Sequence, residues 1–347
     1  MIDRRRFGKL VTLAGAGALT APHLARGLSE RSGGVIKPRV LRKGDTIGMP
    51  APASMSFEPD DVRIAREQIQ ALGFNVRLGQ HVFEKHGYLA GTDEQRAADI
   101  NDMFADDAVD GIFFLRGGWG APRILPLIDF ELIRKNPKIV LGYSDITALL
   151  NAIHQETGLV TFHGPNAGSN IRPWTREQLE RVLMSTEPIG ELGYPPKSPD
   201  ALVERFYRAI PIRPGIARGA LIGGNLTLIS VLMGTPWEIE TAGKILLLED
   251  IHEEIYRVDR MITQLKLAGK LENVAGVAFG YCTDCGGDSQ GFSLEEVLRD
   301  HLEPLGVPVV SGVVLGHIPE KLTLPIGLEA TLDAGEGTIT IDESAVV

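Results

Sequence analysis

The first half of the chain alternates between short apolar runs and amphipathic stretches. The runs at residues 43–50, 74–78, 109–115 and 138–143 have the length of strands, and the last two read as buried ones. Residues 60–73 carry one helical stripe of apolar positions, formed by Val62, Ala65, Ile69 and Leu72. This pattern predicts a helix between the first two strands.

Two more helices are indicated further along. Thr92 and Gln95 have the spacing of a capping box, and the helix that they begin is expected to run to about Ala105. Another helix is expected over residues 145–156. Strands that alternate with helices in this way predict a parallel sheet with helices on both faces.

Near Thr186 the pattern changes. Six prolines fall within fewer than 30 residues, at Pro188, Pro195, Pro196, Pro199, Pro211 and Pro214. Such crowding is typical of a connection between domains. We therefore predict an N-terminal α/β domain over residues 38–186, a proline-rich connection over 187–217 and a C-terminal domain over 218–347.

The C-terminal domain is expected to be a mixed, β-rich α+β structure. It begins with a long apolar stretch at residues 219–232 and continues with a strand at 244–250. An amphipathic helix follows, with its apolar positions at Ile255, Val258, Ile262 and Leu265. Several short strands separated by glycines complete this part of the chain.

Composition limits the possible functions. The chain has 347 residues, of which 44% are hydrophobic and 23% charged, so it can bury a large core and is long enough for two domains. The formal charge is -10 and the body of the chain has no basic run. We therefore expect no nucleic-acid partner and no binding to an anionic membrane surface.

The N-terminus differs from the rest. Residues 1–10 contain an Arg-Arg-x-Phe pattern, and a short apolar run follows at 11–22. This layout predicts a twin-arginine export signal over residues 1–30. The run is too short for a stable membrane anchor, since a spanning helix needs about 20 residues. The alternative is a basic leader that stays attached to a cytoplasmic protein.

Two features bear on metals and redox chemistry. Cys282 and Cys285 form one Cys-x-x-Cys, which is half of a zinc site, so we interpret them as small residues at a strand end, with oxidation as the alternative. His252 and Glu253 begin like His-Glu-x-x-His, but Tyr256 stands at the second ligand position. No metal is predicted.

The stretch VLGYSDITALL carries a serine, Ser144, between an apolar strand and a helix. A nucleophile elbow requires this placement, because the turn lifts the hydroxyl clear of the sheet and directs helix NH groups at an oxyanion. The alternative is that Ser144 or Asp145 only caps the helix. Ile146 replaces the second glycine of Gly-x-Ser-x-Gly, which argues against an α/β-hydrolase.

A nucleophilic serine needs a base and a group that orients the base. His317 follows an apolar strand and a glycine, and Glu249 ends the apolar run of residues 244–250. Three chemically suitable residues, each at the end of a strand, form a pattern that chance produces less often than one.

The chain resembles the LD-carboxypeptidase family, which comprises murein tetrapeptide carboxypeptidases and the related microcin-resistance peptidases. The resemblance covers about residues 44–332 and rests on seven motifs in order: RGGWG (116–120), LGYSDITALL (141–150), FHGP (162–165), GGNL (223–226), GTPWE (234–238), LLLEDIHEEIYRVDRMITQL (246–265) and GHIP (316–319). It implies a flavodoxin-like N-terminal α/β domain and a smaller, β-rich C-terminal domain, with the site between them.

The resemblance also implies roles for individual residues. Ser144 would be the nucleophile, Glu249 the orienter and His317 the base. The oxyanion would be bound by backbone NH groups of Gly117, Gly118 and Asp145. No metal or cofactor is implied. Trp119 stands where the family often has tyrosine or phenylalanine, so this wall of the pocket is expected to differ in size.

By resemblance, the expected reaction is release of D-alanine from a murein tetrapeptide through an acyl-enzyme, and a homodimer is possible. One alternative is a microcin-resistance type of peptidase that cleaves an acidic aminoacyl-nucleotide or another modified peptide. A second, from another class, is a periplasmic solute-binding protein, which needs no triad. Arg116, Arg123 and Arg257 are chemically able to hold a substrate carboxylate.

Overall fold

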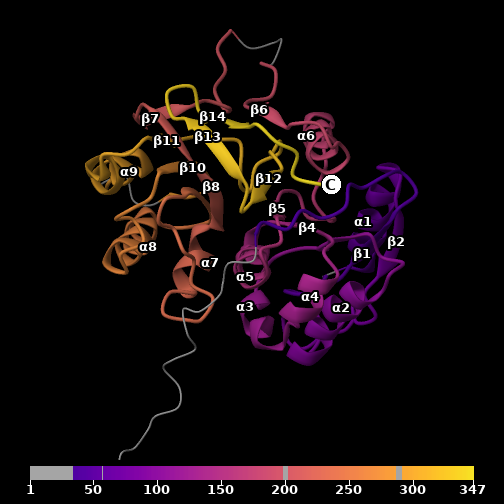
Figure 1. The fold of residues 1–347 in the computed structure, drawn as a ribbon. Coiled ribbons are helices and arrows are strands. Elements are labelled where there is room, and N and C mark those ends of the chain that lie inside the picture. Colours follow the sequence, from indigo (N-terminus) through magenta and orange to yellow (C-terminus); the bar gives the residue numbers. More distant parts are fainter. Residues whose placement is uncertain (1–33, 57, 198–201, 287–290) are drawn as a thin grey trace, which may run out of the picture. The chain divides into compact units, whose positions relative to one another are not determined.

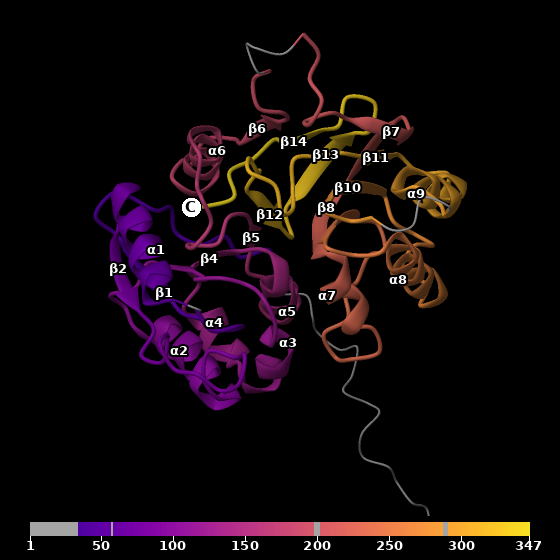
Figure 2. The same ribbon diagram turned by 180° about the vertical axis from the view of Figure 1, so that it is seen from behind.

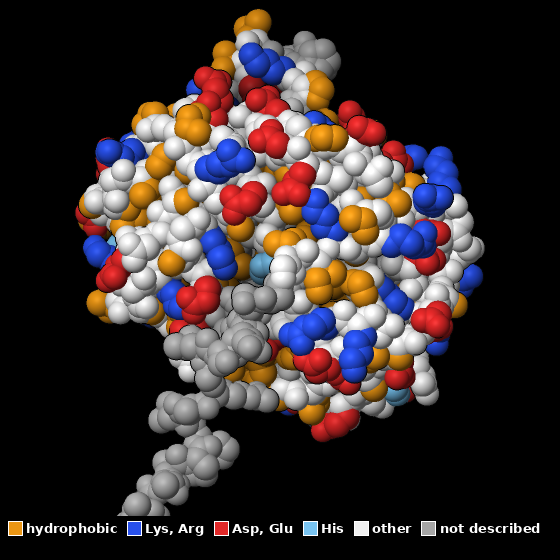
Figure 3. All heavy atoms as spheres, viewed as in Figure 1, with side chains coloured by type: hydrophobic (Ala, Val, Ile, Leu, Met, Phe, Trp, Pro, Cys, Tyr) orange, Lys and Arg blue, Asp and Glu red, His pale blue; other side chains and the backbone are white. Residues whose placement is uncertain are grey.

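The computed structural model describes residues 34–56, 58–197, 202–286 and 291–347. The predicted export signal at residues 1–30 lies outside the described residues. No helix in the described part of the chain is both long and apolar enough to cross a membrane. Lys and Arg side chains are interspersed with Asp and Glu on the face shown in Figure 3.

A six-stranded sheet forms the first layer of the fold (Figure 1). Its strands, in spatial order, are β12 (Leu324–Ile326), β5 (Thr161–His163), β4 (Ile139–Gly142), β3 (Gly111–Phe113), β1 (Thr46–Met49) and β2 (Asn75–Leu78). The first five strands of the chain are parallel and have the order 2-1-3-4-5, which is the flavodoxin-like order. This confirms the predicted parallel sheet and its fold class.

Helices cover both faces of this sheet because successive side chains of its strands point to opposite sides. Phe113 packs into one hydrophobic core and Ile112 into another. The first core includes apolar side chains of α1 (Pro59–Ala71) and α6 (Pro173–Leu183). The second includes those of α2 (Asp93–Ala105), α3 (Ala121–Ile124), α4 (Phe130–Lys135) and α5 (Thr147–Thr157).

Local sequence signals set the ends of these helices. The capping box of α2 is present, since Thr92 accepts the NH of Gln95 and the Gln95 side chain accepts the NH of Thr92. The predicted stripe of α1 is buried at Val62, Ala65 and Ile69. The described chain also contains three short 3-10 helices: η1 (Leu125–Leu127), η2 (Ser144–Ile146) and η3 (Glu303–Leu305).

An eight-stranded mixed sheet forms the second layer. In spatial order its strands are β6 (Gly190–Leu192), β14 (Thr338–Ile341), β13 (Glu329–Asp333), β8 (Ile216–Asn225), β9 (Ile245–Ile251), β10 (Gly276–Thr283), β11 (Val309–Ser311) and β7 (Ile210–Arg213). The four strands from β8 to β11 are parallel. The helices of this part are α7 (Leu226–Val231), α8 (Ile255–Leu267) and α9 (Leu294–Leu302).

Two details of the second half differ from the expectations. The proline-rich segment 187–217 contains β6 and β7, which are the two edge strands of the second sheet. Cys282 and Cys285 do lie at the end of β10, but they are joined in a disulfide. Our interpretation of the pair as merely small residues is therefore wrong, and the oxidised alternative holds.

The strand β12 ties the C-terminal part of the chain to the first sheet. It pairs antiparallel with β5, so that Leu324 lies opposite His163, and both views show the two strands side by side (Figures 1 and 2). Leu324 and Ile326 are fully buried. The loop that contains His317 therefore connects β11 of the second sheet to β12 of the first.

We expect Leu324→Ala to lower the free energy of unfolding by about 2–5 kcal/mol, because it removes buried methyl groups and leaves a cavity at this junction. The matched control is Leu267→Ala, since that leucine is 84% exposed at the end of α8. The control should change the free energy of unfolding by no more than about 0.5 kcal/mol. Urea denaturation of the three proteins measures both values, and equal effects would contradict the assigned role of β12.

Candidate active site

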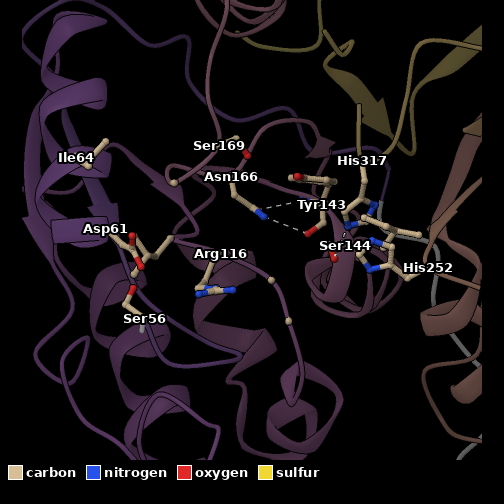
Figure 4. A pocket seen from close by; sticks show the side chains of 15 residues that line it. Ser56, Asp61, Ile64, Arg116, Tyr143, Ser144, Asn166, Ser169, His252 and His317 are labelled. Carbon is tan, nitrogen blue, oxygen red and sulfur yellow. Dashed lines mark hydrogen bonds between the residues drawn. The ribbon is translucent and has the colours of Figure 1, made fainter. Parts of the chain in front are cut away.

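The structure brings Ser144, His317 and Glu249 together at the ends of strands from both sheets. Ser144 follows β4, Glu249 lies near the end of β9, and His317 lies in the loop between β11 and β12. The hydroxyl of Ser144 is 2.9 Å from Nε2 of His317, and Nδ1 of His317 is 2.8 Å from Oε2 of Glu249. Figure 4 shows Ser144 and His317 side by side at one end of a pocket.

The backbone at Ser144 has the geometry of a sharp turn. Ser144 has φ +67°, one of three non-glycine residues with positive φ in the described chain. Tyr143 before it is extended, and η2 leads directly into α5. A left-handed serine costs of the order of 1 kcal/mol and persists only where surrounding contacts hold it. The turn presents the hydroxyl to the pocket instead of to the helix.

The capping alternative is wrong for both candidate residues. The N-cap position of α5 is Ile146, and no side chain caps either α5 or η2. The hydroxyl of Ser144 bonds to His317, while Oδ2 of Asp145 accepts the NH of Ala121 at 2.7 Å. The side chain of Asp145 thus holds the segment that follows the RGGWG loop.

Glu249 is fully buried, and its electrostatic surroundings keep it ionised. Burial opposes ionisation, but the hydrogen bond with His317 and the nearby imidazoles hold the pKa of Glu249 below its ordinary value. An ionised carboxylate accepts a hydrogen bond, so Nδ1 of His317 carries the proton. Nε2 is then the acceptor for the hydroxyl of Ser144.

A second histidine, His163, lies behind this arrangement at the end of β5. It is 2% exposed, and burial lowers its pKa to about 4, so the imidazole is neutral near pH 7. Its ring lies edge-on to that of Tyr143, which in turn lies 4.8 Å from the His317 ring centroid. The ammonium of Lys321 lies 4.2 Å from the Tyr143 ring centroid.

The sequence analysis assigned no role to His163, Tyr143 or Lys321. His163 belongs to the FHGP motif and Tyr143 to the LGYSDITALL motif. The motifs therefore marked both residues, but they did not show that the two side chains lie close to His317. The Tyr143 ring packs against the His317 ring, and His163 and Lys321 in turn contact Tyr143.

The three predicted oxyanion positions lie beside Ser144. A Cβ atom on Gly117 would lie 2.9 Å from Cβ of Ser144 and 3.1 Å from the backbone nitrogen of Asp145, so only glycine fits there. The carbonyl of Gly117 accepts the hydroxyl of Ser54 at 2.9 Å. Because the peptide is trans, the NH of Gly118 points away from Ser54.

Two cavities lie on either side of Ser144. The first, of about 700 Å³, is lined by Ser144 and His317 at one end, by Ser56 and Asp61 at the other, and by Arg116 between them (Figure 4). The second, of about 360 Å³, also includes Ser144 and Asp145 in its lining. Its wall contains the exposed Tyr88 and Trp119, whose rings meet edge to face at 6.2 Å.

The described residues contain no group of three or more His, Cys, Asp or Glu side chains arranged to hold a metal ion. His252, the first residue of the partial zinc motif, lines the first cavity. Its Nε2 lies 3.2 Å from Oδ2 of Asp284, next to the disulfide.

Comparisons with known proteins agree with the motifs. Residues 47–164 match the LD-carboxypeptidase N-terminal domain and residues 218–332 match the LD-carboxypeptidase C-terminal domain. The chain is 42% identical to a probable murein peptide carboxypeptidase of Bacillus subtilis, over 88% of this chain and 94% of that protein. It is 33% identical to the murein tetrapeptide carboxypeptidase of Pseudomonas aeruginosa, over 83% and 92% of the two chains.

Solved structures give the same architecture. The microcin C7 self-immunity protein MccF in complex with aspartyl sulfamoyl adenosine aligns with a TM-score of 0.82 at 27% identity. That alignment covers 90% of this chain and 100% of the other.

The stability of the fold should depend on pH through Asp145, whose pKa is raised by burial to about 6. An unfolded aspartate has a pKa of about 3.9, so the protonated carboxyl favours the folded state at low pH, and this contribution is lost as the pH rises through about 6. We therefore expect Asp145→Asn to gain up to about 3 kcal/mol over the wild type between about pH 4 and pH 8.

Urea denaturation of both proteins across this pH range measures the difference. The amide oxygen of asparagine can still accept the NH of Ala121, so the substitution changes the titration and keeps the contact. Asp102→Asn, at an exposed position of α2, is the matched control and should show no such trend. A pH-independent difference for Asp145→Asn would contradict the titration.

Proposed function

Because the chain belongs to the LD-carboxypeptidase family, we propose that it is a serine carboxypeptidase that releases the terminal D-alanine of murein tetrapeptide. The observation that carries this proposal is the pair of hydrogen bonds that links Ser144, His317 and Glu249 beside a substrate-sized cavity. The names of the murein peptide relatives support the choice of substrate.

In the proposed reaction, Nε2 of His317 takes the proton of Ser144 as the hydroxyl oxygen attacks the amide carbonyl carbon. Glu249 keeps the proton on Nδ1 and stabilises the imidazolium that forms. His317 then gives its proton to the nitrogen of D-alanine as the carbon–nitrogen bond breaks. A water molecule, deprotonated by the same histidine, hydrolyses the acyl ester and restores Ser144.

Backbone NH groups of Gly118 and Asp145 would bind the oxyanion of each tetrahedral intermediate. The bond from Ser54 to the carbonyl of Gly117 supports this assignment, because it turns the Gly118 NH toward the opposite side. Such donors are fixed before the reaction begins, and one of them typically contributes about 10²–10³-fold to kcat. The close approach of Gly117 to Ser144 keeps these groups within reach of the reacting carbonyl.

The two alternative functions, a solute-binding protein and a microcin-resistance type of peptidase, have less support. A solute-binding protein needs neither a left-handed serine nor a hydroxyl within hydrogen-bond distance of an imidazole, and both are present. A microcin-resistance type of peptidase would share the fold and the reaction chemistry, as the likeness to MccF illustrates. The predicted export signal favours a substrate of the cell wall; cytoplasmic murein recycling is the alternative.

We expect the purified wild type to release D-alanine from murein tetrapeptide, and Ser144→Ala to lower kcat by at least about 10⁴-fold, because the nucleophile is lost. His317→Gln should have an effect of similar size. Ser185→Ala, in the loop after α6, is the matched control and should retain wild-type kcat. D-alanine can be quantified by coupled oxidation.

A parallel assay with aspartyl sulfamoyl adenosine as the substrate distinguishes a murein carboxypeptidase from a microcin-resistance type of peptidase. Cleavage of that compound or of aspartyl amides, with no D-alanine released from the tetrapeptide, would replace the murein assignment with the alternative. Full D-alanine release by Ser144→Ala would refute the serine mechanism itself.

A further inference from the structure

We propose that Arg116 binds the free C-terminal carboxylate of the substrate and thereby makes the enzyme a carboxypeptidase. This inference rests on the proposed function, because it assigns a binding group to the same reaction. A peptidase that removes only the last residue must distinguish a terminal carboxylate from an internal amide. A guanidinium is the side chain best suited to this, since it forms two parallel hydrogen bonds with a carboxylate.

The structure separates the three arginines that could serve. Arg123 uses Nε and Nη2 to hold both carboxylate oxygens of Asp93, at 2.9–3.1 Å. Arg257 lies exposed on α8 beside Tyr256 and is not among the residues that line either cavity. Arg116 lines the first cavity together with Ser144 and His317.

Arg116 lies in the chain next to the residues that the proposed reaction uses. Arg116 directly precedes Gly117, which touches Ser144, so its side chain starts next to the proposed oxyanion site. In the substrate, only the nitrogen and Cα of the last residue separate the reacting carbonyl from the terminal carboxylate, a span of about 3.3–3.6 Å. Figure 4 shows the guanidinium in the cavity between Ser144 and the end formed by Ser56 and Asp61.

The charges in the cavity place the anion at this point. Among the described residues that line it, Arg116 is the only Lys or Arg, and Asp61 is the only Asp or Glu. Asp61 repels a carboxylate from the far end, so the favourable position is the one between Ser144 and Arg116. Nη1–H of Arg116 donates to the carbonyl of Met55 at 3.3 Å, which ties the guanidinium to the segment beside the cavity.

The test compares three tetrapeptides that differ in one group. The first ends in D-alanine, the second in D-alaninamide, and the third keeps the free terminus but has the side-chain carboxylate of its third residue amidated. We expect the wild type to favour the first peptide over the second by about 10–100-fold in kcat/KM, as expected for a charged hydrogen-bonded pair. The first and third peptides should be cleaved at similar rates.

Arg116→Gln should lower kcat/KM for the free-acid peptides about 10–100-fold, mainly by raising KM, and should leave the D-alaninamide peptide almost unchanged. Arg116→Lys should keep part of the preference for the free acid, because it retains a point charge. Arg257→Gln is the matched control and should behave as the wild type does. Thermal melting of each variant checks that it is folded.

Four results would overturn the proposal. Equal losses on the acid and the amide would mean that Arg116 acts only by supporting the Gly117–Gly118 segment. If amidation of the side-chain carboxylate in the third peptide lowered kcat/KM, and Arg116→Gln removed this difference, Arg116 would bind that side-chain carboxylate instead. A wild type that does not discriminate between acid and amide, while still releasing the last residue through Ser144, would refute the inference and leave the proposed function intact. Failure to cleave any peptide would refute both.

Discussion

The buried carboxylate of Glu249 imposes the constraint on which the site depends. A charge removed from water costs several kcal/mol unless close partners compensate for it. Here the compensation comes from the hydrogen bond that Nδ1 of His317 donates to Oε2 of Glu249. The parallel pairing of β9, β10 and β11 makes this possible, because it brings the ends of these strands to one edge. Gly316 is needed beside them, since a Cβ there would lie 2.9 Å from Oε2 of Glu249.

A second requirement is that the two sheets keep a fixed position relative to each other. Ser144 follows a strand of the first sheet, whereas Glu249 lies near the end of a strand of the second and His317 follows another. Buried polar side chains of α5 provide the link. Asn151 exchanges two hydrogen bonds with the backbone of Gly223, and the hydroxyl of Thr147 accepts the NH of Asn225. These bonds lie directly after the turn at Ser144. Satisfied buried polar contacts of this kind have one arrangement only, so they fix α5 against β8.

Burial shifts the pKa of three ionisable side chains around the site. Burial makes His163 neutral near pH 7 and raises the pKa of both Asp145 and Asp250 to about 6. Near pH 7 both aspartates are therefore largely ionised, and each loses its charge as the pH falls through about 6. Arg116 is the only Lys or Arg among the described residues that line the larger cavity.

The sequence by itself determined the elements whose signals are local. The capping box at Thr92 depends on contacts within three residues, and the stripe of α1 is a repeat of apolar residues at helical spacing, so spacing alone encodes both. Strand ends followed by a glycine also pointed to the candidate residues Ser144 and His317. Motif resemblance added their roles, which remain a proposal until the variants are measured.

Only the tertiary structure decided the features that join distant segments. The pairing of β12 with β5, the disulfide at the end of β10 and the position of Arg116 in the lining of the larger cavity all depend on which surfaces meet. The positive φ of Ser144 is of the same kind, because a serine takes that conformation only when contacts from elsewhere hold it. Periodicity reports which side of an element is buried, whereas the partner across that interface is set by packing of the whole chain.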